Sequence, residues 1–285
     1  MRTISATLRR SYLLGFPAAF AAALAFSGAD AGNLASPQIP SPPAGSATIW
    51  YLGHCGYAVR TPNQLLIFDY QEKSDGRARK QRPEKPSLDS GWIDPAEIKD
   101  LKVRVFVSHS HEDHFDPVIF TWKKAVPDIA TFIGWKADLD ASCTYFPGPR
   151  TGFKAADLEI DTINSHHSGV PESAWLVKVD GLVVYHNGDC QPDDPVSEHA
   201  YLKTKTDRID LAFVFPVIQE GAKYTIQERD LFSRFKIGAA FPMHATAGDV
   251  MYQSFQKDMQ ARFPGLVIHV PMKMGQKFVY SRSRP

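Results

Sequence analysis

The 285-residue sequence contains only three cysteines, Cys55, Cys143 and Cys190. At least one of them must stay unpaired, so a disulfide scaffold is excluded and a hydrophobic core must hold the fold. The formal net charge is only +1, and no basic patch with interleaved aromatic residues is present. We therefore expect no nucleic-acid partner. The chain also lacks internal repeats, which favours one domain over an array.

An apolar run long enough to cross a membrane is also lacking. The apolar stretch 11–26 is shorter than the roughly 20 residues that a spanning helix needs, and Gly15 and Pro17 interrupt it. A basic segment precedes it, and the small-x-small pattern Ala29–Ala31 follows. We therefore expect residues 1–31 to be an export signal, removed at a periplasmic or secreted destination without stable membrane insertion afterwards.

The dipeptide Arg9-Arg10 leaves both the general and the twin-arginine export routes open. Removal of Arg2, Arg9, Arg10 and Asp30 with the signal would change the net charge from +1 to −1. A tether rich in proline and serine follows at 32–46. The remaining residues, 47–285, are expected to form the folded domain.

The rest of the chain reads as a mixture of short strands and helices. Helices are expected from Asp94-Pro95, from Asp116-Pro117, at 226–235 and at 248–262. Asp180-Gly181 is typical of a two-residue hairpin turn. The expected strands are 47–53, 56–60, 64–70, 103–109, 158–164, 174–179, 182–189, 209–216, 237–244 and 266–271. This alternation predicts an α/β fold with sheets covered by outer helices.

The segment 71–87 is highly charged and has no apolar period. It contains six basic and three acidic residues. Such a segment could hold an anionic substrate, but a solvated surface loop is the favoured interpretation. Trp92 and Trp122 are expected to be exposed aromatic residues, either packed locally or at a pocket rim or interface. The sequence does not predict an oligomeric state.

The stretch "VSHSHEDHFDP", 107–117, concentrates metal-ligand side chains after an apolar strand. Alternate residues of an extended segment share a face, so His109, His111 and Asp113 should project together, joined by His114 where the chain turns. Imidazoles and a carboxylate suit a borderline cation such as zinc. The zincin pattern is excluded because Phe115 stands where its second histidine would be.

Further candidate ligands stand at other strand ends. They are His166 or His167 in "SHHSG", Asp189 in "NGDC" and His244 in "PMHAT". Each is weak alone, because a single histidine at a strand end is more often structural. One turn cannot complete two coordination shells, so a two-metal site would need ligands from such places.

With these motifs, and with Asp69 in "IFDY", the chain resembles the metallo-β-lactamase superfamily over about residues 51–272. The resemblance implies a four-layered αββα sandwich. The opening "YLGHCGYAVRTPNQLLIFDY" is most similar to the branch of small-molecule lactonases and phosphodiesterases. Residues 47–285 are therefore expected to be a hydrolase domain of this fold.

The resemblance also implies roles for individual residues. His109, His111 and His167, with His166 as the alternative, would hold one metal. Asp113, His114 and His244 would hold a second, and Asp189 would bridge both. Asp69 would orient a ligand histidine. Two divalent ions are expected, with zinc preferred and manganese or iron as alternatives.

Such ions would support hydrolysis of a small ester, lactone or phosphodiester by a metal-bound hydroxide. Asp113 and His54 are the candidate catalytic residues, and His54 either contacts substrate, protonates the leaving group or is structural. Cys55 and Cys190 lack a partner base, so packing is favoured over nucleophilic catalysis or a mutual disulfide. A phospholipase D-like lipid hydrolase and a catalytically silent binding protein are the alternatives.

Overall fold

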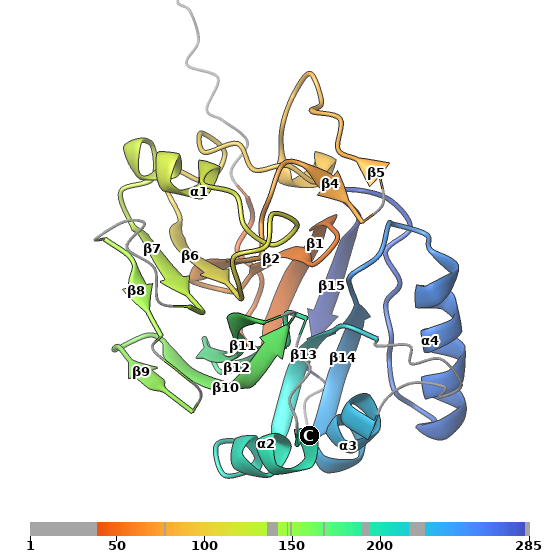
Figure 1. Cartoon of the computed structure of the whole chain (residues 1–285). Coiled ribbons are helices and arrows are strands. Elements are labelled where there is room, and N and C mark those ends of the chain that lie inside the picture. The colour runs from red at the N-terminus through yellow and green to blue at the C-terminus, as the bar shows by residue number, and fades with distance from the viewer. Residues whose placement is uncertain are drawn as a thin grey trace, which may run out of the picture. The chain divides into compact units, whose positions relative to one another are not determined.

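The computed structural model describes residues 39–282, apart from 77, 136–141, 147, 149, 168, 190–193 and 217–225. Contacts within the chain group Ser36–Pro285 as one compact unit. This unit contains two large sheets and four α-helices among its described residues. Figure 1 labels most of these elements.

The first sheet has seven strands in the order β15, β1, β2, β3, β6, β7 and β8. Pairing is antiparallel from β15 to β3 and parallel from β3 to β8. Parallel neighbours end at the same sheet edge, which brings the residues after β3 and β6 together. The strands are β1 (Ser46–Gly53), β2 (Gly56–Arg60), β3 (Gln64–Phe68), β6 (Lys102–Val107), β7 (Ile129–Ile133), β8 (Thr144–Tyr145) and β15 (Lys277–Ser281).

The second sheet has six strands in the order β14, β13, β12, β11, β10 and β9. Strands β12, β13 and β14 are parallel, so the residues that follow β12 and β14 also share an edge. The strands are β9 (Gly152–Lys154), β10 (Glu159–His167), β11 (Val170–Val179), β12 (Leu182–His186), β13 (Arg208–Val214) and β14 (Lys236–Pro242).

Three apolar clusters separate four layers. One cluster lies between the sheets and includes Tyr57, Phe68, Trp175 and Phe213. A second packs the first sheet against α1 (Val118–Thr121) and the 3-10 turns η1 (Leu88–Ser90) and η2 (Trp122–Lys124). A third packs the second sheet against the remaining helices (Figure 1). These helices are α2 (Pro195–Lys203), α3 (Ile226–Arg234) and α4 (Val250–Arg262). The predicted αββα sandwich is therefore confirmed.

Segment 71–87, which we expected to be a solvated loop, contains a short hairpin of β4 (Ser74–Asp75) and β5 (Ala78–Arg79). Its turn packs closely on the chain after β14. A Cβ atom on Gly76 would lie 2.7 Å from the backbone nitrogen of Thr246. Gly76 also has a positive φ of 59°, which glycine tolerates best. The hairpin is thus fixed against the edge where β14 ends.

Several local predictions are confirmed. Asp180 and Gly181 both have positive φ, as a type I′ hairpin turn between β11 and β12 requires. The helix expected from Asp116 is present as α1 and η2, and the Asp116 carboxylate accepts a hydrogen bond from the backbone N–H of Val118. Helices α3 and α4 also lie where the sequence places them.

Two expected elements are wrong. The helix expected from Asp94 is a pair of separate turns, closed by hydrogen bonds from Glu97 N–H to the Asp94 carbonyl and from Leu101 N–H to the Ile98 carbonyl. The strand expected at 266–271 pairs with β14 only through an isolated bridge at Ile268. Ile93 and Ile98 in the first segment and Ile268 in the second are buried in apolar clusters against the sheets, so packing rather than local propensity sets both segments.

Trp92 and Trp122, expected to be exposed, are buried. The Trp122 ring packs against Tyr70 beneath the first sheet. Trp92 is 4% exposed and lines a pocket, so the pocket-rim alternative is the correct one for that residue. Among the described residues, no helix has the length and apolar character needed to span a membrane.

Candidate metal centre

The predicted ligand residues that the structure describes meet where strands of both sheets end. His109, His111, Asp113 and His114 lie in the connection between β6 and α1. Asp189 follows β12, and His244 follows β14. The turn between β1 and β2 adds His54. Segments nearly 200 residues apart thus supply one cluster at the edge of the sandwich.

Two residues of this cluster, and Asp69 beside it, have left-handed backbone conformations. The φ angles are 55° at His54, 42° at Asp69 and 73° at His244. Such angles are uncommon for residues other than glycine and cost about 1–3 kcal/mol each, so the surrounding structure must impose them. A hydrogen bond from His244 N–H to the His54 carbonyl, 3.2 Å long, joins two of them. Strain of this kind concentrates at functional sites.

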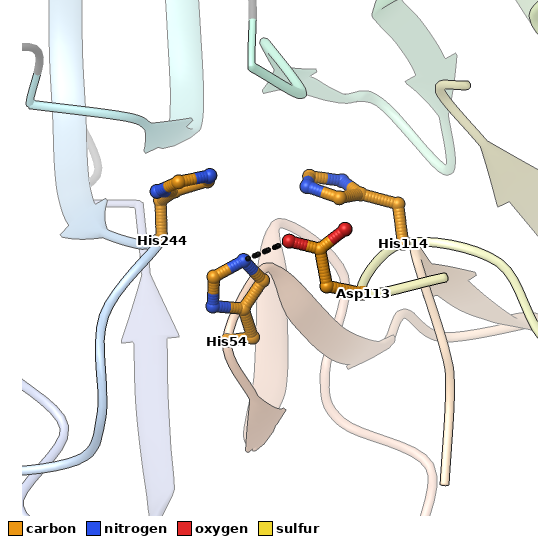
Figure 2. A group of neighbouring side chains, drawn as sticks. All are labelled: His54, Asp113, His114 and His244. Carbon is orange, nitrogen blue, oxygen red and sulfur yellow. Dashed lines mark ion pairs between the residues drawn. The ribbon is translucent and has the colours of Figure 1, made fainter. Parts of the chain in front are cut away.

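Four side chains point toward one another in Figure 2: His54, Asp113, His114 and His244. Each offers a ligand atom, and these atoms all lie within 4.8 Å of one another. His54 Nε2 is 3.2 Å from the Asp113 carboxylate. His54 and His114 are buried, whereas Asp113 and His244 are partly exposed. The predicted ligands Asp113, His114 and His244 are thus adjacent, and His54 stands with them.

Asp189 lies between two of these histidines. One carboxylate oxygen is 3.1 Å from His114 Nε2, and the other is 2.9 Å from His244 Nε2. The side chain is almost fully buried. Burial would raise the pKa of Asp189, but the charges and hydrogen bonds of His114 and His244 hold this pKa well below its usual range. The carboxylate is therefore ionised inside the molecule.

Asp69 makes the kind of contact expected of a residue that orients a ligand histidine. Its Oδ2 is 2.8 Å from His114 Nδ1, which leaves His114 Nε2 directed toward the cluster. The same carboxylate accepts hydrogen bonds from the backbone N–H and hydroxyl of Ser108, both 2.7 Å long. Partners of this type fix the tautomer and the orientation of a metal-binding imidazole.

His109 and His111 form a second pair of adjacent imidazoles. His109 Nε2 is 3.0 Å from His111 Nδ1. On its other side, His109 Nδ1 is 3.3 Å from the Glu172 carboxylate, which also accepts a 2.6 Å hydrogen bond from the backbone N–H of Asp189. The side chains of His166 and His167 lie outside the described residues, and so does Cys190.

Cys55 is fully buried with its thiol free, and its Sγ is 3.9 Å from Asp189 Oδ1. Burial raises the pKa of this thiol far above its ordinary value, so it is not the thiolate that nucleophilic catalysis requires. Cys55 Sγ also lies within 4.8 Å of ligand atoms of His114 and Asp189, a group of three that could hold a metal ion.

Sequence reasoning missed three residues that support the cluster: Ser108, Glu172 and Asp75. Ser108 stands within the histidine motif, but nothing local indicates its contact with Asp69. Glu172 is a charged residue within the apolar strand β11 and is 6% exposed, which was an available signal. Asp75 is buried within the charged segment and accepts a hydrogen bond from the backbone N–H of His54, 3.0 Å long.

The donor set fits divalent metal ions. Imidazole nitrogens and carboxylate oxygens are the ligands that zinc and iron take in proteins. His54 Nδ1 is buried without a hydrogen-bond partner among the described residues, and His54 Nε2 and His114 Nε2 face the carboxylates of Asp113 and Asp189. A buried imidazole nitrogen in this state costs free energy unless a cation or a solvent molecule satisfies it.

A pocket of about 1170 Å³ opens beside the cluster. His111, Glu112 and Asp113 form its wall on the metal side, and Trp92 lies on the wall too. The remaining lining comes mainly from the segment that follows β3: Glu72, Lys73, Ser74, Gly76, Arg79, Lys80, Gln81 and Arg82. The interpretation of this segment as a merely solvated loop is therefore wrong, since Lys80 is only 8% exposed.

Residues 48–244 match the family model of the beta-lactamase superfamily domain. The chain belongs to this superfamily. The resemblance drawn from the "HSHEDH", "GDC" and "PMH" motifs is thereby confirmed, and the matched region contains every predicted metal ligand.

A UPF0173 metal-dependent hydrolase of Thermococcus kodakarensis is 25% identical over 150 residues, which are 49% of this chain and 59% of that protein. The match thus spans about three fifths of this curated relative. The prediction of a metal-dependent hydrolase agrees with the superfamily and with the name of this relative.

Solved structures share the fold at lower identity. Igni18, a metallo hydrolase from Ignicoccus hospitalis, has a TM-score of 0.55 and 17% identity over 84% of this chain and 100% of its own. The metallo-beta-lactamase fold protein YhfI from Bacillus subtilis has a TM-score of 0.52 and 14% identity, covering 82% and 99%. The diiron beta-hydroxylase CmlA from Streptomyces venezuelae has a TM-score of 0.52 and 10% identity, covering 85% and 55%.

Proposed function

We propose that this protein is a hydrolase with two divalent metal ions, acting on a small ester, lactone or phosphodiester. The observation that carries the proposal is the position of Asp189, whose two carboxylate oxygens face His114 and His244 from a buried position. His114 and His244 belong to one of the two proposed ions. The Glu172 carboxylate, which accepts a hydrogen bond from the Asp189 backbone N–H, lies 3.3 Å from His109 of the other group, so Asp189 is positioned between the two sets of ligands. Zinc is the preferred metal, with manganese or iron as alternatives.

The ligand assignment follows the two groups of side chains. His109, His111 and His167 would hold one ion, and Asp113, His114 and His244 the other, with Asp189 between them. When bound, ions of this kind supply Lewis acidity and make water a nucleophile at neutral pH. Asp69 holds the His114 ring through Nδ1, so that Nε2 stays available to a metal.

His54 is proposed to handle the proton of the leaving group. Its ring lies 3.2 Å from Asp113 and has a centroid distance of 4.5 Å to His244. Burial lowers the pKa of His54, although the neighbouring Asp113 carboxylate opposes this shift. The ring is buried and contacts Asp113, which lines the pocket, so a titratable imidazole stands next to the place where a substrate would bind.

Other parts of the proposal rest on the sequence. The basic and apolar segments of residues 1–31 support export to the periplasm or secretion. The near-zero net charge argues against a nucleic-acid partner, and the pocket volume favours a small-molecule substrate. A phospholipase D-like activity is less favoured, because the pocket wall carries many charged side chains rather than an apolar lining for lipid tails.

The test is turnover by the metal-free and the reloaded protein. The chain is stripped with a chelator, reloaded separately with zinc, manganese and iron, and assayed with a nitrophenyl ester, a simple lactone and bis-nitrophenyl phosphate. The proposal expects one bond type to be cleaved only after reloading. Reloaded protein that binds metal but cleaves none of the three would overturn it in favour of a binding protein.

The role of His54 is tested with His54→Asn, because asparagine tolerates the left-handed backbone that His54 adopts. Loss of a proton carrier predicts a fall in kcat of about 100-fold or more, with metal content unchanged. Elemental analysis accompanies the kinetics. If His54→Asn instead loses one metal ion per chain, His54 is a ligand and the proton role is wrong.

A further inference from the structure

The pocket beside the metal centre has an excess of positive charge on the wall away from the ligands. Lys73, Arg79, Lys80 and Arg82 all line it. Two of these cations already have partners, since Lys73 Nζ is 3.3 Å from Glu112 and an Arg82 guanidinium nitrogen is 3.1 Å from Glu72. The other two, Arg79 and Lys80, form no ion pair with any residue that the structure describes.

Lys80 is the less usual of the two, because it is buried. It is 8% exposed, and its ammonium donates a hydrogen bond to the Gln71 carbonyl and lies 5.2 Å and 5.7 Å from the ring centroids of Tyr70 and Trp92. A carbonyl and two rings use only part of the capacity of an ammonium group with three donors. The carboxylates of Asp75, Glu72 and Asp116 act on this charge from nearby, but none of them forms an ion pair with Lys80 among the described residues, so the ammonium keeps donor capacity for an anion.

Arg79 lies beside Lys80 on the exposed side of the same pocket wall. It is the last residue of β5 and lies one residue before Lys80 on the pocket wall. Its guanidinium is exposed and, within the described part of the chain, has no hydrogen-bond or ion-pair partner. A planar guanidinium binds carboxylate and phosphate oxygens through paired hydrogen bonds, whereas an ammonium acts as a point charge. Both side chains line the same pocket.

The hairpin that carries these residues is held in place. The Thr246 hydroxyl donates a 2.7 Å hydrogen bond to the Asp75 carbonyl, and the Ala247 backbone N–H donates to the Asp75 carboxylate. Because Thr246 and Ala247 follow His244 closely, the hairpin is anchored on the loop that carries this candidate metal ligand. A substrate could therefore contact both at a fixed separation.

We propose that this pocket recognises an anionic group of the substrate, a carboxylate or a phosphate, through Arg79 and Lys80 while the bond to be cleaved lies at the metal centre. The proposal rests on the hydrolase function above and adds the substrate class to it. Trp92 lines the same pocket, and its ring lies beneath the cationic groups of Lys80 and Arg82.

The kinetic test compares matched nitrophenyl esters with a neutral, a carboxylate-bearing and a phosphate-bearing acyl chain. The quantity measured is kcat/KM for each anionic ester divided by kcat/KM for the neutral one. The wild type should prefer one anionic ester, and Arg79→Gln should lower that ratio by about tenfold, as loss of a charge-assisted hydrogen bond predicts. The preferred ester shows whether the group is a carboxylate or a phosphate.

Arg262→Gln is the matched control, because Arg262 is an exposed arginine on α4 and does not line the pocket. Its ratio should equal that of the wild type. A ratio near one for the wild type, or an unchanged ratio in Arg79→Gln, would overturn the anion site while leaving the hydrolase intact. No cleavage of any of the three esters would count against the esterase form of the proposed function instead.

A binding measurement provides a readout independent of turnover. Calorimetric titration with inorganic phosphate and with acetate is carried out on metal-loaded wild type, Arg79→Gln and Arg262→Gln. The proposal expects the Kd of one of the two anions to rise about tenfold in Arg79→Gln alone. Equal affinities in all three proteins would place anion binding at the metals and contradict a role for Arg79.

Discussion

At the scale of a single residue, Lys80 stands out because its pKa differs from that of an ordinary lysine. Burial lowers the pKa of its amine to about 8, against the smaller opposing effects of Asp75, Glu72 and Asp116. In the unfolded chain the pKa of a lysine is about 10.4. Between these values the unfolded state binds more protons than the folded state, so the stability rises with pH. At a pH below the pKa of Lys80 in the folded state, burial of the charged ammonium lowers the free energy of unfolding by its full amount.

We therefore expect the substitution Lys80→Met to change the pH dependence of unfolding. Between pH 7 and 9.5 the free energy of unfolding of the wild type should rise by about 2 kcal/mol relative to that of the variant. Urea unfolding of both proteins at each pH measures the difference. The exposed Lys257→Met is the control and should run parallel to the wild type. A parallel curve for Lys80→Met as well would show that Lys80 has an ordinary pKa.

Individual ligand residues were predictable from the sequence where their density is unusual. Three of the ten histidines fall within His109–His114, directly after an apolar strand, and this pattern has few structural explanations. Glu172 and Asp75 were not predictable in the same way. Their contacts with His109 and His54 join segments far apart in the chain, and only the folded structure shows which strand end faces which.

At the scale of an element, the β4–β5 hairpin depends on one buried carboxylate. Asp75 Oδ1 accepts hydrogen bonds from the Tyr51 hydroxyl, 2.6 Å, and the His54 backbone N–H, 3.0 Å. Asp75 Oδ2 accepts one from the Ala247 N–H, 3.2 Å. The side chain thus joins the hairpin to the turn that carries His54 and to the loop that carries His244.

The substitution Asp75→Asn should therefore disturb the position of the hairpin. The NH₂ group of asparagine would donate toward a place where three hydrogen-bond donors already converge. We therefore expect the free energy of unfolding to fall by about 2 kcal/mol. We also expect weaker metal retention, because the loops of His54 and His244 lose a shared anchor. Chemical denaturation and metal release during dialysis measure the two effects.

The control for this element is the exposed Asp100→Asn, which removes a similar charge from the surface. It should change the stability by less than about 0.5 kcal/mol. If Asp75→Asn matches this control in both stability and metal retention, the hairpin does not depend on Asp75.

Element boundaries show where sequence patterns are reliable. The Asp180-Gly181 turn follows from backbone chemistry that acts within two residues, and it is present. The helix expected from Asp94 and the strand expected at 266–271 depend on neighbours instead. In the first case turn hydrogen bonds form in place of a helix. In the second, backbone hydrogen bonds of Val267 and His269 to Ala240 make only an isolated bridge to β14 at Ile268.

At the scale of the whole molecule, the two sheets bring distant strand ends to one edge. The parallel pairs β3–β6 and β12–β13–β14 deliver Asp69, the histidine motif, Asp189 and His244 to the same place. The order of strands in each sheet could be inferred only through the resemblance to the superfamily. For the charged segment 71–87 the sequence offered an anionic-substrate role only as the less favoured alternative, because a charged segment reads alike whether it is solvated or packed.

The most direct test of the account is metal content measured together with turnover for the wild type and Asp189→Asn. Asparagine keeps the size of the side chain but removes the charge and one acceptor oxygen. The account predicts two ions per chain in the wild type, and in the variant a loss of at least one ion with a fall in turnover of more than about 100-fold. Metal-free wild type that retains full activity, or a variant with unchanged metal and unchanged rate, would contradict it.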